Sequence, residues 1–239
     1  MRVAALALCS FLVAADVSPE PARVVTARAR AGPRIARALE TAGVPGPRTV
    51  LLRVFKEEGV LEVWVAEGRE RPFVHLGDHP VCASSGGPGP KVRHGDGQVP
   101  EGVYRVTALN PWSQFHLSMR LDYPNAADRA RNPGVEAREL GGEIFIHGGC
   151  ATIGCIPLGD EAIEEVYLLA QQTRAAGGEV SVLILPARPG AARWTAIVGR
   201  GTPGEVSLWR SLEVLSTRLD RTHRWPRIQA QPDGSYVAD

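Results

Sequence analysis

Short runs of β-branched and aliphatic residues, separated by turns, constrain the fold of this chain most strongly. Residues 49–55 and 60–65 are two such runs, and they flank the turn Glu57-Glu58-Gly59, a pattern typical of a β-hairpin. The 26 glycines and 19 prolines interrupt the chain often, which favours short strands over long helices. Further strands are predicted over residues 73–76, 80–83, 103–108, 115–119, 143–146 and 179–185. We therefore expect many short strands rather than long helices.

Three segments show the apolar spacing of amphipathic helices. The first lies around Ile35, Ala38 and Leu39 and ends at Gly43. The clearest begins at Asp160, which we expect to be its N-cap, and ends at Gly177. The third covers residues 205–219, with a stripe of four leucines that is more typical of a core face than of a partner-binding face.

The proline- and glycine-rich segment 44–47 predicts a linker and a domain boundary. From Arg23 to Arg37 there are five arginines and no acidic residue. We interpret them as a solvated helix face; the alternative is a weak contact with anionic envelope polymers. The expected organisation is a signal peptide (1–15), a basic helix with its linker (16–48), a catalytic domain (49–188) and a C-terminal extension (189–239).

The N-terminus resembles an export signal. One arginine precedes an uncharged run from Val3 to Ala15, which is too short for the about 20 residues that span a bilayer. The run suits the apolar region of a signal peptide, with cleavage after Ala15. The alternative is a buried N-terminal helix. We expect an exported, periplasmic or envelope-located protein.

Charge and cysteine content narrow the function. The net charge is +1 and aromatic residues make up 6% of the chain, which argues against nucleic acid as a partner. If Cys9 leaves with the signal peptide, three cysteines remain. In an oxidising compartment an odd number leaves at least one thiol unpaired, and it is either reactive or buried and inert.

The segment IFIHGGCATIGCIPLGDEAIEEVY carries the candidate chemistry. A predicted strand ends in His147, Cys155 follows eight residues later, and a helix comes next. A thiolate is the attacking form of cysteine, and a nearby imidazole can take its proton. Gly154 would let the backbone turn so that amide N–H groups face a developing oxyanion.

Spacing alone leaves other interpretations open. His147, Cys150 and Cys155 could be zinc ligands with a fourth residue, although no second ligand pair matches. Cys150 could form a disulfide with Cys155 or with Cys82. His147 could also be a core histidine bonded to backbone.

The segment resembles the active-site motif of L,D-transpeptidase catalytic domains of the YkuD type. In that family a strand ends in I-H-G and the nucleophile lies in [ST]-x-G-C, as in Ile146-His147-Gly148 and Thr152-Ile153-Gly154-Cys155. Residues 95–104 (GDGQVPEGVY) are similar to the family's G-x-x-x-T-P-x-G-x-[FY] stretch, with Val99 in place of threonine. The resemblance covers about residues 49–186. It implies a mostly β fold with flanking helices (α+β), an L,D-transpeptidase-like β-sandwich with a helix after the catalytic cysteine.

A murein L,D-transpeptidase branch shares the short H-G-x-C-x-x-x-G-C loop and a C-terminal extension, and the chain is similar to it. Two positions depart from many family members: Ile153 replaces a histidine and Pro157 replaces an arginine. These departures leave the nucleophile and base in place and affect carboxylate recognition and transpeptidation.

The resemblance implies Cys155 as nucleophile, His147 as base, Gly148 as its orienting carbonyl, and the N–H groups of Gly154 and Cys155 as oxyanion hole. Cys150 matches a cysteine of the branch without a derived role, and we expect it to be a structural thiol or to form a disulfide with Cys82. A second set is expected either to contact substrate or to form a turn: Tyr123, Asn125, Asp128 and Arg129.

The implied substrate is the peptide stem of peptidoglycan, cut at the diamino acid through a thioester on the cysteine. No metal or cofactor is needed, and a monomer is expected. A hydrolase of the same fold would instead trim stems or detach proteins anchored to peptidoglycan. A non-enzymatic envelope-binding module is the third class.

Overall fold

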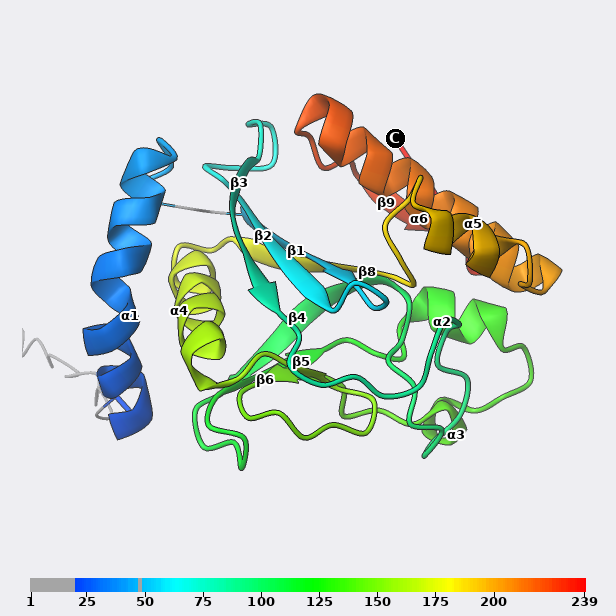
Figure 1. The fold of residues 1–239 in the computed structure, drawn as a ribbon, viewed down its shortest axis with the longest axis horizontal. Helices are drawn as coiled ribbons and strands as arrows, with labels where there is room; N and C mark the ends of the chain where they lie inside the picture. The colour runs from blue at the N-terminus through cyan, green and yellow to red at the C-terminus, as the bar shows by residue number, and fades with distance from the viewer. Residues whose placement is uncertain (1–19, 47–48) are drawn as a thin grey trace, which may run out of the picture.

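A single curled sheet of eight strands forms the centre of the protein, in the order β3-β2-β1-β8-β4-β5-β6-β7 (Figure 1). The computed structural model describes residues 20–46 and 49–239, so the predicted signal peptide (1–15) lies outside the described residues. The strands are β1 (Thr49–Phe55), β2 (Val60–Ala66), β3 (Val74–Pro80), β4 (Gly102–Asn110), β5 (Ser118–Leu121), β6 (Phe145–His147), β7 (Ile156–Pro157) and β8 (Glu179–Leu185). A separate two-stranded sheet joins β9 (Ile228–Ala230) to β10 (Tyr236–Ala238).

Helices cover both faces of this sheet (Figure 1). The helices are α1 (Ala22–Thr41), α2 (Ala126–Arg131), α3 (Ala137–Leu140), α4 (Asp160–Ala175), α5 (Ala192–Val198) and α6 (Pro203–Thr222). Among the helices of the described residues, none is long and apolar enough to cross a membrane. The expected α+β class, with helices flanking a sheet, is confirmed.

Strand β1 lies in the middle of the sheet. It pairs antiparallel with β2, from Thr49 opposite Ala66 to Phe55 opposite Val60, as the hairpin pattern predicts. On its other edge it pairs parallel with β8. All seven residues of β1 are buried, which explains its almost continuous apolar sequence, since a strand covered on both faces does not alternate.

Two hydrophobic cores sit on opposite faces of the sheet. Val50, Leu52 and Val54 of β1 point into the core beneath α4 and α1. Leu51 and Phe55 point into the second core, beneath α5 and α6. The leucine stripe of α6 belongs to this second core, as its spacing predicts: Leu208, Leu212, Leu215 and Leu219. The C-terminal segment therefore completes the fold around the sheet.

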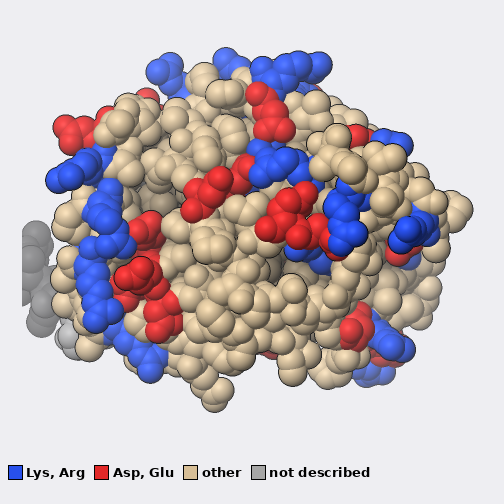
Figure 2. All heavy atoms as spheres, in the orientation of Figure 1, with Lys and Arg blue, Asp and Glu red and all other residues tan. Residues whose placement is uncertain are grey.

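Helix α1 packs its apolar face against α4 and points its arginines outward. Arg30 and Arg34 reach Glu164 and Glu165 of α4, at 3.5 and 2.6 Å, and more than half of each arginine side chain is exposed. The arginines form the blue stripe over α1 in Figure 2. The predicted solvated helix face is what the structure shows. The apolar face consists of Val24, Ala27, Ala31, Ile35 and Leu39.

Three local predictions are wrong. Residues 73–83 do not form a pair of short strands, because β3 continues through Gly77 as one strand along β2. Strand β5 begins at Ser118 instead of residue 115, because His116 has a positive φ of 65°. Gly159, not Asp160, is the N-cap of α4. The two-residue strand β7 gave no sequence signal.

A buried ion pair joins α6 to the sheet. The side chain of Arg53 in β1 is 2% exposed and lies 2.6 Å from Glu62 of β2 and 2.7 Å from Asp220 of α6. It also donates to the Ser216 hydroxyl at 3.0 Å. A buried charge needs such partners, since an unpaired one is costly.

Replacing Arg53 with leucine is expected to lower the free energy of unfolding by about 3 kcal/mol, because it leaves Glu62 buried without its main partner. Urea denaturation followed by circular dichroism measures this. The control is Glu213→Ala, which breaks an exposed pair with Arg210 and should cost less than about 1 kcal/mol. Equal losses in the two variants would contradict the account.

Candidate active site

The two strands β6 and β7 bring the predicted nucleophile and base together. They run parallel, with Ile146 opposite Ile156 and His147 opposite Pro157. Ile146 and Ile156 point into the core beneath α4. Because side chains alternate along a strand, His147 and Cys155 lie on the other face, on neighbouring strands and two positions apart in register. The eight residues 148–155 connect the two strands, so His147 and Cys155 stand at the two ends of one short loop.

The thiol of Cys155 is free and partly exposed. Its sulfur accepts a hydrogen bond from the backbone N–H of Phe145 at 3.4 Å and lies 3.7 Å from the carbonyl oxygen of Glu143. Burial raises the pKa of the Cys155 thiol above its ordinary 9.0, and the Phe145 N–H offsets part of that rise. At neutral pH the resting group is therefore a thiol rather than a thiolate.

His147 is buried, with 2% of its surface exposed. Its Nδ1 lies 2.5 Å from the carbonyl oxygen of Gly148. A carbonyl can only accept, so Nδ1 carries the proton and Nε2 keeps a free lone pair. The Phe115 ring packs over the imidazole at 4.6 Å between centroids. Burial lowers the pKa of His147 below its ordinary 6.5, so the ring is neutral at neutral pH.

The described residues show no hydrogen bond between His147 and Cys155. Catalytic hydrogen bonds are often long in enzymes without substrate and shorten in the complex. A neutral imidazole with a free Nε2, on the same face as a neutral thiol, is the arrangement in which the base takes the proton during attack.

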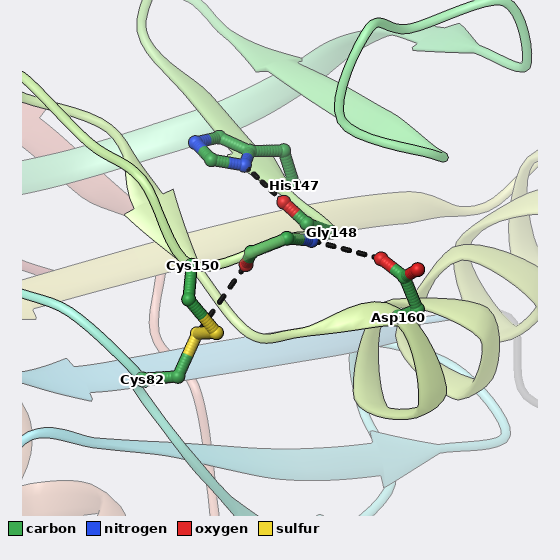
Figure 3. The surroundings of a disulfide bond; sticks show 6 residues. Cys82, His147, Gly148, Cys150 and Asp160 are labelled. Carbon is green, nitrogen blue, oxygen red and sulfur yellow. Dashed lines mark hydrogen bonds between the residues drawn. A yellow bond between two sulfur atoms is a disulfide. The ribbon is translucent and has the colours of Figure 1, made fainter.

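The loop after His147 is held from both sides (Figure 3). A side chain at Gly148 would meet the Asp160 carboxylate and the Phe115 carbonyl at 2.7 Å, so only glycine fits there. The N–H of Gly149 donates to the Asp160 carboxylate at 2.9 Å. Asp160 thus ties this loop to the start of α4.

Cys82 and Cys150 form a disulfide, with their Cα atoms 5.4 Å apart. The expected pairing of Cys82 with Cys150 is confirmed, and the alternative pairing of Cys150 with Cys155 is wrong. Because Cys150 is bonded, it cannot be a free zinc ligand. The described residues contain no group of three or more His, Cys, Asp or Glu side chains placed to hold a metal ion.

The two amides predicted for an oxyanion hole already have partners. The N–H of Gly154 donates to the Ser85 hydroxyl at 2.6 Å. The N–H of Cys155 donates to the Thr152 hydroxyl at 2.9 Å, and that hydroxyl donates back to the Cys155 carbonyl at 2.8 Å. An incoming oxyanion must therefore displace a hydroxyl or be bound by one.

A small pocket of about 70 Å³ opens beside Cys155. The segment Ser84–Gly87 forms one wall, and Val99, Ile156 and Lys56 form others. Lys56 donates to the buried Glu101 at 3.0 Å, and Glu101 also accepts from Trp209 of α6 at 2.6 Å. The pocket is thus braced by the C-terminal helix.

Each of the four candidate substrate-binding residues has an internal partner. The Tyr123 hydroxyl is buried, and its single O–H is shared between the Lys91 and Leu140 carbonyls. Asn125 and Asp128 form the capping box of α2, and Arg129 donates to the Pro124 carbonyl at 2.7 Å. These contacts describe the predicted turn; substrate contact by the four residues stays a prediction.

No sequence pattern selects Ser85, Phe115 or Asp160 as site residues. Ser85 follows the predicted strand over residues 80–83, and Phe115 begins the predicted strand over residues 115–119. Asp160 was expected to cap α4. The short spacing from His147 to Asp160 was the one available signal that its carboxylate could reach the loop.

The chain was compared with known proteins. The family model of YkuD, the L,D-transpeptidase catalytic domain, matches residues 48–206. Two curated relatives, from Escherichia coli strain K12 and from Escherichia coli O157:H7, both carry the name "Putative L,D-transpeptidase YafK". Each is 38% identical over 120 residues, which is 49% of this chain and 46% of the relative. The chain thus spans about half the length of the curated relatives that it matches.

Solved structures with a similar trace include the helical cell shape determining protein Pgp2 from Campylobacter jejuni, with a TM-score of 0.48 and 20% identity over 70% of this chain and 59% of that one. Bd1075 from Bdellovibrio bacteriovorus has a TM-score of 0.37 and 19% identity over 59% of this chain and 48% of that one. The family model covers both the sheet and the site described above. The chain therefore belongs to the YkuD family of L,D-transpeptidase catalytic domains.

Proposed function

We propose that this protein is an exported L,D-transpeptidase that acts on peptidoglycan peptide stems at the diamino acid through a thioester on Cys155. The observation that carries the proposal is the pairing of β6 with β7, which places a free thiol and an imidazole of fixed tautomer on one face. Membership of the YkuD family supports the substrate class.

The reaction follows from these groups. Nε2 of His147 takes the thiol proton as the sulfur bonds to the stem carbonyl carbon, and the π pair moves onto oxygen. The tetrahedral intermediate collapses, the C–N bond breaks, and His147 returns the proton to the departing amine. An acceptor amine then attacks the thioester and releases Cys155.

The pH profile tests which protonation state reacts. Burial lowers the pKa of His147 and raises that of Cys155. At every pH between these two pKa values, both side chains are therefore neutral. We expect kcat/KM to fall only below pH 6.5 on the acid side and to hold to about pH 9 on the alkaline side. An alkaline decline that begins near pH 7 would indicate a thiolate–imidazolium resting pair and contradict the account.

Product analysis tests the reaction class. Purified stem tetrapeptides and intact peptidoglycan are incubated with the protein, and the products are identified by mass spectrometry. Cross-linked dimers establish a transpeptidase. Shortened stems without dimers, or released peptidoglycan-anchored proteins, indicate that water resolves the thioester and that the hydrolase alternative is correct.

Location and partners complete the proposal. The uncharged run at residues 3–15 supports export to the periplasm or cell envelope. Peptide stems are the proposed partner, with anchored proteins as a second class, and the protein is proposed to act as a monomer. Unchanged stems, with Cys155 oxidised in the purified protein, would favour an envelope-binding module.

A further inference from the structure

Residues 82–87, which include Ser85, are attached to the loop between β6 and β7 and to the segments beside it. The Cys82–Cys150 disulfide joins it covalently to the loop after His147. The N–H of Cys82 donates to the Pro157 carbonyl of β7 at 3.0 Å. The N–H of Gly87 donates to the Gln98 side chain at 2.9 Å. The segment is therefore held in place before substrate arrives.

The Ser85 hydroxyl accepts a hydrogen bond from the Gly154 amide, so its own O–H is not used in that contact. The Gly154 N–H lies 2.6 Å from Ser85 Oγ. Among residues 20–46 and 49–239, no acceptor takes the Ser85 O–H. Ser85 and Cys155 line the same small pocket. The Ser85 O–H can therefore donate a hydrogen bond to a group bound beside the Cys155 thiol.

The Gly154 amide has little freedom to move away from Ser85. Gly154 has a φ of 101°, and a side chain there would meet the Gln98 carbonyl oxygen at 3.0 Å. The backbone is thus packed against Gln98 in a conformation that glycine adopts without strain. A substrate oxygen on this amide would have to occupy the position that Ser85 Oγ now holds.

We propose that the Ser85 hydroxyl, polarised by the Gly154 amide, is a catalytic residue that donates the oxyanion hydrogen bond during attack by Cys155. Hydrogen bonds in a chain strengthen one another, so a hydroxyl that accepts from an amide is a better donor. The oxyanion forms when the sulfur–carbon bond closes, and no proton leaves Ser85. This inference rests on the proposed cysteine mechanism and changes the oxyanion donor from a bare amide to a side chain.

Two probes of the same thiol separate this role from a structural one. p-Nitrophenyl acetate acylates a thiol through a tetrahedral oxyanion, whereas iodoacetamide alkylates it without one. In the full chain, Ser85→Ala is expected to lower the acylation rate about 100-fold and to leave the alkylation rate within twofold. Ser207→Ala, which removes a hydroxyl that donates to Asp233 and lies outside the pocket, is the matched control and should change neither rate.

A loss of acylation of less than tenfold in Ser85→Ala, or an equal loss in both reactions, overturns the Ser85 proposal. A faster acylation would show that Ser85 blocks the amide, which also overturns it. A wild-type protein that the ester acylates but that leaves peptidoglycan stems unchanged overturns the proposed function and not the role of Ser85.

Discussion

Replacing Cys155 with alanine is expected to lower turnover of peptidoglycan stems at least about a thousandfold, because the proposed reaction passes through a bond to the Cys155 sulfur. Product formation is followed by liquid chromatography and mass spectrometry. The side chain is only partly buried, so its loss should leave the fold intact.

A measurement of the free energy of unfolding is the control, because it shows whether Cys155→Ala is folded. Its urea midpoint should match that of the wild type, since the sulfur makes only long contacts: it accepts from the Phe145 N–H at 3.4 Å and donates to the Glu143 carbonyl at 3.7 Å. Retained turnover in a folded Cys155→Ala protein would show that another group attacks the stem.

His147→Gln is expected to reduce kcat by about 10²- to 10⁴-fold, because glutamine cannot take the thiol proton. It should also slow alkylation of Cys155 at neutral pH, where burial keeps the thiol protonated. The alkylation reaction is quenched at several times, and intact-protein mass spectrometry gives the alkylation rate at each pH.

The matched control is His75→Gln, since His75 is exposed on β3, where its side chain pairs with Asp78 and its ring lies beside Trp64. This variant should have wild-type rates in both assays. An alkylation profile of His147→Gln identical to that of the wild type would remove His147 from its role as base.

Much of the fold follows from local sequence pattern. The hairpin of β1 and β2, strand β8 and the helix α4 lie where β-branched runs and helical spacing predict them. These elements bury long apolar segments. Apolar runs and helical spacing in a sequence indicate which residues are buried, so elements of this kind can be predicted. The leucine stripe of α6 likewise identifies a core face, but its partner, the far side of the sheet, depends on the tertiary fold.

The parts of the site that the sequence left open depend on contacts between distant segments. Ser85 meets Gly154 across 69 residues, and Cys82 meets Cys150 across 68. Strand β7 has two residues, too few for any periodicity. The strand end at His147 was predictable because a buried apolar run leads directly into it.

The corrected N-cap of α4 has a physical reason of the same kind. Asp160 is a favourable capping residue by type, but its carboxylate accepts from the Gly149 N–H in the loop after His147. The Asp160 side chain, which the local pattern assigns to the helix N-terminus, therefore bonds to the loop between β6 and β7 instead.

The central claim is that Cys155 carries the stem as a thioester. The most direct test is intact-protein mass spectrometry of the full chain, acid-quenched during turnover of a stem tetrapeptide, followed by peptide mapping. The account predicts an adduct with the mass of the stem acyl group, located on Cys155, released by hydroxylamine and absent from Cys155→Ala. Product formation without an adduct under rapid quenching, or an adduct on another residue, would contradict it.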